Sequence, residues 1–376
     1  MEGLQYIAQN SFRAQRFLAV PGFRHPAYEC ALFNRETSDA SQFVTRALPA
    51  GDIANWLRDL VHNEKEGLAD AQLKLVYIDR ALDVTLGVSR AVFEEILVVM
   101  NADPSVLYMI HRDYDGFHEY HGKGYYQTRF VGTPLYALLW TFDPQTCTTR
   151  GIFFRRLWNT FDSFGDMLQI YQREICYSQV LSFVSVLFLL NWFDTQTNER
   201  ELDPIRSIEG ATGFGPNKTS SEKPGLKKFD IDELTRWSQT IGEVAGNITN
   251  KLRHQRNSQF MLEKIKDDKS GRIAFGNPPP GWCTKYEQSR SSLVDAIPSV
   301  EKHMYTYCEY LKYLKDRSER LASVVSTRDD YRMSSVCALG DLANHHGTNS
   351  FLRFSHTRMR VPASRWPWRA SETALL

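Results

Sequence analysis

The sequence predicts an α+β protein, with a mixed N-terminal domain (1–160) followed by a long-helix domain (161–332) whose helices are antiparallel. Two observations favour this fold class. Aromatic runs separated by turn residues cover 111–157, which is typical of an antiparallel sheet. Nearer the C-terminus, apolar residues recur at alternating three- and four-residue spacing over two long segments, which is typical of packed helices.

Composition limits the possible functions. The 376 residues carry 45 Lys and Arg against 44 Asp and Glu, a net charge of +1. Such a balance gives no general electrostatic reason for nucleic acid or an anionic membrane as partner, so we expect no nucleic-acid partner. The six cysteines form no C-x-x-C pair, which indicates reduced thiols rather than a zinc site or a disulfide framework. The N-terminus has no uninterrupted apolar region, so no signal peptide is expected.

The N-terminal domain is expected to mix helices and strands. Four elements precede its sheet: a helix across 51–64, a strand across 73–79, a helix across 90–101 and a short helix from Pro104. Ser89 is a suitable N-cap for the third of these. In residues 1–48, Pro21 and Pro26 exclude a long helix.

Three aromatic-rich runs predict the strands of the sheet. They cover 124–131, 135–142 and 150–158. Gly132-Thr-Pro134 and Asp143-Pro-Gln-Thr146 supply the turns between them.

The stretch Ile175–Phe193 contains nineteen residues without a charge and is followed at once by a charged, helix-compatible segment. Its length would suffice to cross a bilayer core of about 30 Å. However, Ser178, Gln179 and three further polar residues interrupt it, and the flanks lack the Lys/Arg asymmetry of an inserted helix. A buried core helix that continues past Asp194 is therefore favoured over a membrane span.

Two long helices follow a Gly/Ser/Lys-rich loop (207–228). The first covers 231–267, with Asp230 as N-cap and Glu233 completing a capping box. Its apolar seam is interrupted by three polar residues, Lys251, Gln255 and Ser258. A Pro-rich turn at 271–282 leads to the second helix, across 298–328, which Pro298 opens.

The second long helix has the cleanest heptad seam in the chain, and the short connection predicts that it pairs antiparallel with the first. Because the first seam is interrupted, we expect apolar surface to remain near Leu311 and Leu314. Another subunit could bury that surface, which predicts a homo-oligomer formed through the long helices. Residues 333–376 show no period and are expected to be a disordered basic tail or sequence from a shifted reading frame or an intron.

Only one cluster has metal-ligating residue types, the segment HRDYDGFHEYH (111–121), with His111, Asp113, Asp115, His118, Glu119 and His121. Its spacing fits no known ligand motif, so a polar loop before a hairpin is favoured over a metal site. Other candidates are weaker: Cys176 as an inert buried thiol, ATGFG (211–215) as a turn, His345-His346 in the tail, and Lys251–Arg256 and Lys312–Arg320 as solvated faces. No catalytic or cofactor-binding residue is predicted, the metal ligands stay unassigned, and an enzyme is the least favoured class.

Several segments are similar to the fungal CorA-like cation-transporter family. They are LDPIRSIEGATGFG (202–215), which resembles an I-R-x-I-E-x-x-T-G pattern, VFEEILVVMNADPSVLYMI (92–110), YALLWTFDPQTCTTRGIFF (136–154) and the helix over 310–336, which resembles the stalk. The resemblance implies a cytosolic domain and stalk, Mg²⁺ or another divalent cation as the transported or regulatory ion, a membrane location and assembly into rings.

The chain departs from that family at the pore. It has no G-M-N signature and no apolar run after Met333 that could span a bilayer. We therefore expect the cytosolic regulatory and stalk portion of a transporter, unable to conduct alone and cytoplasmic or peripheral, with a membrane partner only if C-terminal spans exist. The alternative is a soluble coiled-coil protein that serves interaction or oligomerisation without catalysis.

Overall fold

The structure is a computed structural model, which describes residues 2–33, 40–63, 67–81, 84–112, 114–121, 127–157, 160–214, 230–268 and 282–344. Of residues 2, 40, 121, 282, 283 and 328–344 only the backbone is described. Met1–Val325 forms one compact unit, and Ser326–Leu376 forms a second, of which the structure describes the helical residues up to Asn344.

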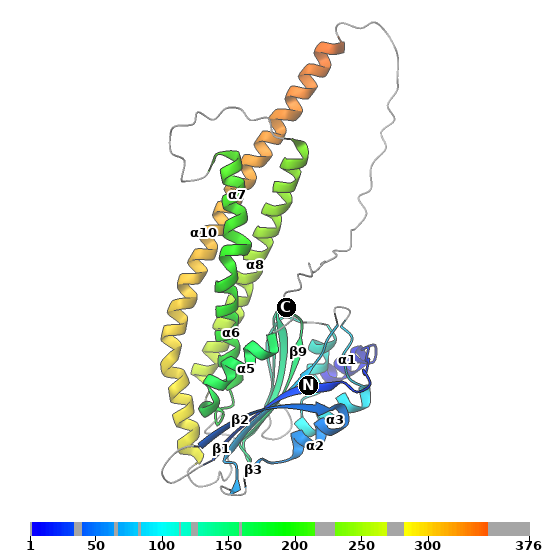
Figure 1. The fold of residues 1–376 in the computed structure, drawn as a ribbon, viewed down its shortest axis with the longest axis vertical. Helices are drawn as coiled ribbons and strands as arrows, with labels where there is room; N and C mark the ends of the chain where they lie inside the picture. The colour runs from blue at the N-terminus through cyan, green and yellow to red at the C-terminus, as the bar shows by residue number, and fades with distance from the viewer. Residues whose placement is uncertain are drawn as a thin grey trace. The chain divides into compact units, whose positions relative to one another are not determined.

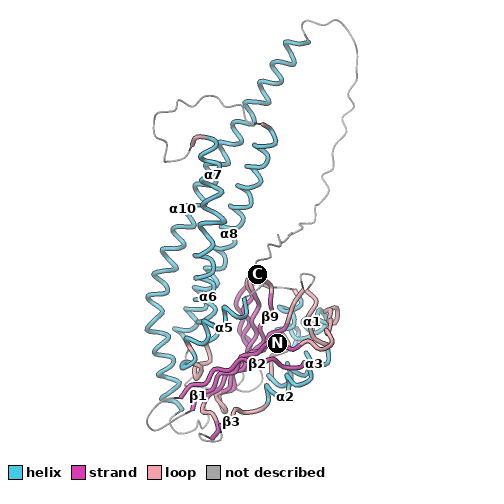
Figure 2. The backbone as a smooth tube through the Cα atoms, viewed as in Figure 1, coloured by secondary structure: helices cyan, strands magenta, loops and turns pink. Residues whose placement is uncertain are grey.

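A seven-stranded sheet organises the N-terminal half of the first unit (Figures 1 and 2). Its strands are β1 (Arg24–Phe33), β2 (Ala40–Pro49), β5 (Ala71–Ile78), β6 (Gly116–His121), β7 (Gln127–Gly132), β8 (Tyr136–Asp143) and β9 (Thr148–Arg155), in the order β2-β1-β5-β9-β8-β7-β6. Only the central pair, β5 and β9, is parallel. The short strands β3 (His62–Asn63) and β4 (Gly67–Leu68) pair separately. The predicted α+β fold class is thereby confirmed.

The central strands are buried on both faces of the sheet, which explains their nearly continuous apolar sequences. In β5, Leu73 and Leu75 point into the core shared with the long helices. Val76 and Ile78, on the opposite face of the same strand, belong to the core beneath the N-terminal helices. The predicted strands across 73–79, 124–131, 135–142 and 150–158 correspond to β5, β7, β8 and β9.

One face of the sheet is covered by short helices. They are α1 (Glu2–Phe12), η1 (Ala50–Asp52), α2 (Ile53–Arg58), α3 (Arg90–Met100) and α4 (Val106–His111). The predicted cap of α3 is present, since Ser89 accepts a hydrogen bond from the Val92 amide at 3.3 Å. The helix predicted across 51–64 is shorter than expected: α2 ends at Arg58.

The opposite face packs against α5 (Thr160–Ile170), the tight turn η2 (Gln172–Glu174) and α6 (Val180–Thr197). As predicted, the helix continues past Asp194, through a π-helical turn η3 (Asn198–Leu202) into α7 (Asp203–Thr212). Within the described residues, the run Val180–Thr212 is long and apolar enough to cross a membrane, and 67% of its most apolar window is buried inside the protein. A core helix of a soluble protein meets the same criterion.

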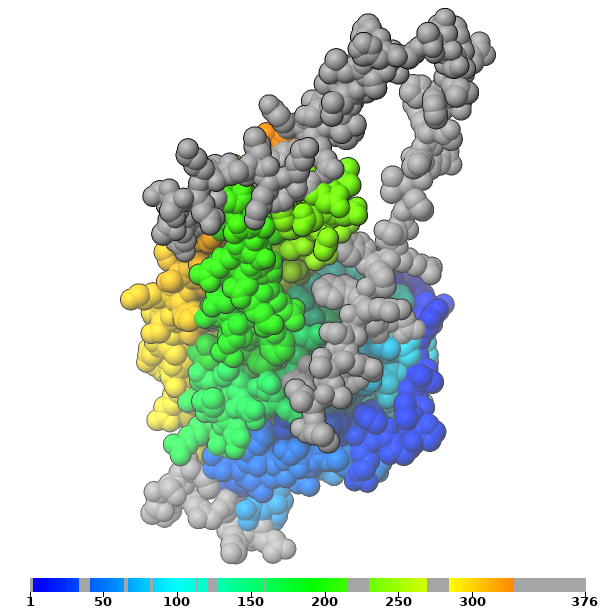
Figure 3. Space-filling view, turned by 45° about the horizontal axis from the view of Figure 1, so that its top comes forward, coloured from blue at the N-terminus to red at the C-terminus, as the bar shows by residue number. Residues whose placement is uncertain are grey.

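Two long helices complete the unit, α8 (Ile231–Asp267) and α10 (Trp282–Asn344). The predicted capping box of α8 is present at Asp230 and Glu233. The helices run antiparallel (Figure 1), and Lys266 near the end of α8 donates to Glu301 of α10 at 2.6 Å. The space-filling view shows the yellow half of α10 beside the green α6–α7 segment (Figure 3).

The start of α10 differs from the prediction. Pro298 does not open the helix but lies inside it, sixteen residues after Trp282. Proline in a helix interior removes one hydrogen bond and leaves a carbonyl without its donor. Pro298 is exposed, so water can satisfy that carbonyl. Part of the predicted irregular tail is also helical, because α10 continues to Asn344, whereas residues 345–376 lie outside the described residues.

Residues 1–48 contain the short helix α1 and the long strands β1 and β2, so no long helix crosses Pro21 and Pro26, as predicted. One further prediction is wrong, because the seam of α10 is not left open. Leu311 and Leu314 are both 0% exposed within a single chain, where they belong to the same hydrophobic core as the buried residues of α6, α7 and α8.

Candidate functional site

The segment 111–121 is not a loop, because its second half is the edge strand β6. Its side chains are dispersed and engaged separately. Glu119 accepts from Arg129 at 2.7 Å, His111 lies 3.3 Å from Gln15, and the His118 ring contacts Tyr114. Asp113 and the His121 side chain lie outside the described residues. Among the described residues no three His, Cys, Asp or Glu side chains gather as metal ligands would.

Asp115 instead links the sheet domain to α8. Its carboxylate accepts from Arg156 at 2.5 Å and from Arg253 of α8 at 2.6 Å. His254, which is 1% exposed, lies 3.7 Å from the same carboxylate. Burial lowers the pKa of His254 to about 4, although the charge of Asp115 opposes the shift. The histidine is therefore neutral at pH 7, and the arginines carry the positive charge of this contact.

The remaining sequence candidates have structural positions. Cys176 is buried, and its carbonyl accepts from the Cys147 thiol at 3.6 Å. In ATGFG, Gly213 is the left-handed C-cap of α7, with φ of 76°. The interpretation of the basic runs as solvated faces is wrong for two members: Lys251 and Arg317 have side chains only 8% and 11% exposed. His345-His346 lies outside the described residues.

Lys251 is the centre of a buried polar network between α6, η3 and α8. Its ammonium donates to Glu201 Oε2 at 2.6 Å, to Thr197 Oγ1 at 2.9 Å and to the Phe193 carbonyl at 3.4 Å. Burial lowers the pKa of Lys251 and raises that of Glu201, while their mutual attraction opposes both shifts. The first interruption of the α8 seam is therefore compensated within the chain.

The other two interruptions are not compensated in the same way. Gln255 and Ser258 are 2% and 1% exposed, and their side-chain polar atoms have no hydrogen-bond partner among the described residues. Buried groups of this kind cost stability, roughly 1–3 kcal/mol each. The α8 seam is thus stabilised at one polar position and weakened at the next two.

The network continues to α10 through Thr197. This hydroxyl gives its single proton to the Phe193 carbonyl at 2.6 Å and accepts from Lys251. The Tyr307 hydroxyl of α10 lies 2.8 Å from it and must be the donor of that bond, because a threonine has one proton and two lone pairs. Burial raises the pKa of Tyr307, so the phenol keeps this proton at neutral pH.

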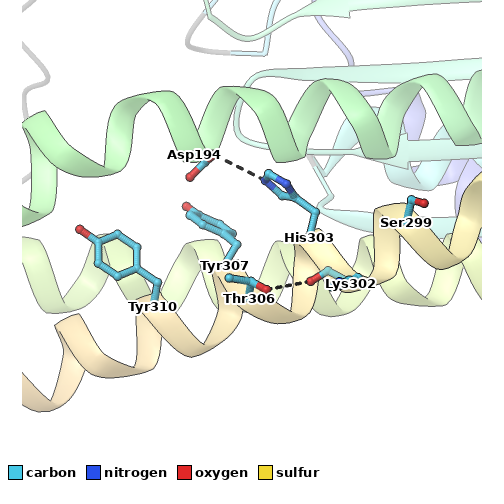
Figure 4. A pocket seen from close by; sticks show the side chains of 7 residues that line it. All are labelled: Asp194, Ser299, Lys302, His303, Thr306, Tyr307 and Tyr310. Carbon is cyan, nitrogen blue, oxygen red and sulfur yellow. Dashed lines mark hydrogen bonds and ion pairs between the residues drawn. The ribbon is translucent and has the colours of Figure 1, made fainter.

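A cleft of about 490 Å³ lies above this network, between α6 and α10 (Figure 4). Its lining residues are Asp194 from α6 and Ser299, Lys302, His303, Thr306, Tyr307 and Tyr310 from α10. Asp194 and His303 face each other across it, with Oδ2 and Nε2 3.5 Å apart and side chains 49% and 56% exposed. The Tyr310 hydroxyl donates to Asn198 of the π-helical turn at 3.1 Å. A π-helical turn beside a cleft is a feature frequently found at functional sites.

Three hydroxyl protons of the cleft are already engaged in hydrogen bonds. Thr306 donates its hydroxyl proton to the Lys302 carbonyl at 3.0 Å, and both phenols give their protons to protein oxygens. Sequence reasoning missed Thr197, Glu201 and Tyr307. The sequence does contain a signal for the first two. Thr197 and Glu201 are four residues apart, immediately after the apolar stretch, so both lie on the same face of the helix. A polar pair on a buried helix face is expected to meet a cation on the helix packed against it, and Lys251 is such a cation.

The segment 202–215 is also positioned by an ion pair. Glu209 of α7 accepts two parallel hydrogen bonds from the Arg317 guanidinium of α10, at 2.6 and 2.5 Å. Both side chains are largely buried, at 8% and 11% exposure. This paired geometry fixes α7 against α10 near the end of the bundle.

No protein-family model matches this chain, and no curated protein matches it.

Proposed function

We propose that this chain is the cytosolic regulatory and stalk portion of a CorA-like divalent-cation transporter, without catalytic activity and unable to conduct ions alone. One observation carries the proposal: a mixed sheet domain and the long helices α6–α7, α8 and α10 share one hydrophobic core. Motion of the helices is thereby mechanically tied to the sheet domain, which is what a regulatory stalk requires.

The segments that resemble the family support this assignment by their positions. Glu209, in the I-R-x-I-E-x-x-T-G-like segment, pairs with Arg317 in the segment that resembles the stalk. Gly213 of the same segment ends α7 in the left-handed conformation that favours glycine. Two of the family-like segments therefore contact each other. The proposed location is cytoplasmic or peripheral, and the proposed ion is Mg²⁺ or another divalent cation.

Assembly through the long helices is part of the proposal, and it must use the outer face of α10 because the seam is covered. Tyr305 on that face is 69% exposed. We expect native mass spectrometry of the full chain to show a homo-oligomer of one closed stoichiometry, whose population changes with Mg²⁺. Tyr305→Asp should abolish it, whereas Tyr6→Asp on α1, at 67% exposure, should not.

The second candidate is a soluble helical interaction protein that does not respond to divalent cations. The complete burial of Leu311 and Leu314 inside one chain favours it, because no second subunit is needed to cover them. A chain that stays monomeric with and without Mg²⁺ would refute the transporter proposal and support this alternative.

A further inference from the structure

We propose that the cleft between α6 and α10 binds a small alkylammonium ion. This inference rests on the cleft alone and does not depend on the proposed transporter role. Three features of the site carry it: the direction of its hydrogen bonds, the placement of its charges and its aromatic walls.

The hydrogen bonds leave an acceptor oxygen at the cleft. The Tyr310 phenol donates to Asn198, so its oxygen keeps lone pairs for a ligand, whereas the Tyr307 phenol donates to Thr197 within the buried network. Asp194 adds a carboxylate. Its distance of 3.5 Å from the His303 ring exceeds that of an ordinary hydrogen bond, about 2.7–3.2 Å, so the carboxylate retains capacity to accept.

Asp194 is the charged side chain that faces a ligand in the cleft, because the neighbouring cations are paired with carboxylates or lie on the rim. The buried Lys251 is neutralised by Glu201 at 2.6 Å. Lys302 lies on the rim, because it is about 100° around the helix from His303, which points at α6. Arg206, near Tyr310, lies 3.7 Å from Asp203.

Aromatic rings and volume select the class of cation. His303, Tyr307 and Tyr310 recur at four- and three-residue spacing, so their rings follow one face of α10 toward α6 (Figure 4). An ammonium near a phenol ring is attracted by the ring quadrupole. A volume of about 490 Å³ suits a small organic ligand. A divalent metal ion would find a single carboxylate here, whereas an alkylammonium finds a carboxylate, an acceptor oxygen and apolar ring surface.

The test is isothermal titration of the full chain with putrescine, at ionic strength held constant with NaCl. Wild type should show saturable binding. Asp194→Asn should weaken it about tenfold or more, which corresponds to losing one close charge interaction of about 1.4 kcal/mol. Tyr310→Leu should weaken it about two- to fivefold by removing one aromatic wall. Lys302→Ala should tighten binding, because a like charge leaves the rim.

Glu309→Gln is the matched control. It also removes one carboxylate, from an exposed position of α10 outside the cleft, and should leave binding unchanged. Absence of saturable binding to wild type would overturn the proposal. So would an affinity insensitive to Asp194→Asn, or a site that takes Mg²⁺ in place of putrescine. Sedimentation velocity of each variant verifies that it remains folded, so that a lost site is not confused with a lost fold.

Discussion

The buried pair of Lys251 and Glu201 provides the sharpest test of the helical bundle. In Lys251→Met the methionine fills similar space without charge, and Glu201, at 0% exposure, is left without its cation. Removing one partner of a buried pair typically costs about 3–5 kcal/mol, because the remaining charge is desolvated and unpaired. We expect that loss in the free energy of unfolding, measured by urea titration with far-ultraviolet circular dichroism at pH 7.5.

The cost should depend on pH in a defined direction. Burial already raises the pKa of Glu201, and removing the lysine removes the attraction that opposes this shift. The unfolded carboxyl loses its proton near its ordinary pKa, whereas the folded one holds it to a higher pH. The variant's stability should therefore fall, relative to wild type, as pH rises between the unfolded and the folded pKa.

Two companion variants complete the experiment. Replacing both partners, Lys251→Met with Glu201→Met, should be close to neutral or stabilising, because two apolar groups need no compensation. Lys312→Met is the matched control: this lysine is 60% exposed and pairs with Glu309, so its replacement should leave the free energy of unfolding nearly unchanged. A decrease in the free energy of unfolding of less than about 1 kcal/mol in Lys251→Met would refute the reasoning, because a buried carboxylate without its cation destabilises the folded state by more than that.

Three further predictions concern other parts of the unit. His254 should lower the free energy of unfolding as pH falls from 6.5 toward 4, by up to about 1.4 kcal/mol per pH unit, because in that range only the unfolded ring binds a proton. His254→Gln should flatten the measured dependence of stability on pH. Gly165→Ala should destabilise strongly, since the added Cβ would lie 2.3 Å from a ring carbon of Tyr28. Gly210→Ala, where no atom lies within 4 Å of the added Cβ, should stabilise by up to about 1 kcal/mol through its higher helix propensity. Thermal unfolding of the two variants separates the effect of crowding from that of helix propensity. Leu311→Ala and Leu314→Ala should each lower the free energy of unfolding by about 2–5 kcal/mol in urea titration, while the sedimentation coefficient of the folded protein stays unchanged. Dissociation of an oligomer without loss of stability would contradict the burial of these leucines within one chain.

Local signals explain which elements could be predicted. The capping box at Asp230 and Glu233 fixes the start of α8, because both partners lie within one turn. The uncharged run that becomes α6 is helical and buried, since a stretch of that length without charges has to be covered by other protein or by lipid. The start of α10 was predicted wrongly at Pro298, because proline suits the first turn of a helix but is also tolerated at an exposed position inside one.

The site could not be predicted in the same way, because its parts are distant in the sequence. Lys251 and Glu201 are 50 residues apart, and Thr197 and Tyr307 are 110 residues apart. Their meeting depends on the axial register of α8 and α10 against α6, and no local pattern encodes that register. The cleft depends on the same register, because Asp194 faces His303 only when the two helices pass at that level.

The sequence by itself determined the fold class, four of the seven strands of the sheet (β5, β7, β8 and β9) and the periodic, apolar face of each long helix. These follow from interactions within a few residues: alternation along a strand, turn chemistry and capping. The tertiary structure alone decided that the polar residue Lys251 is paired rather than exposed, that the seam at Leu311 is closed within one chain, and that a cleft opens beside η3. The physical reason is that burial and pairing are properties of neighbours in space, which packing of whole helices selects.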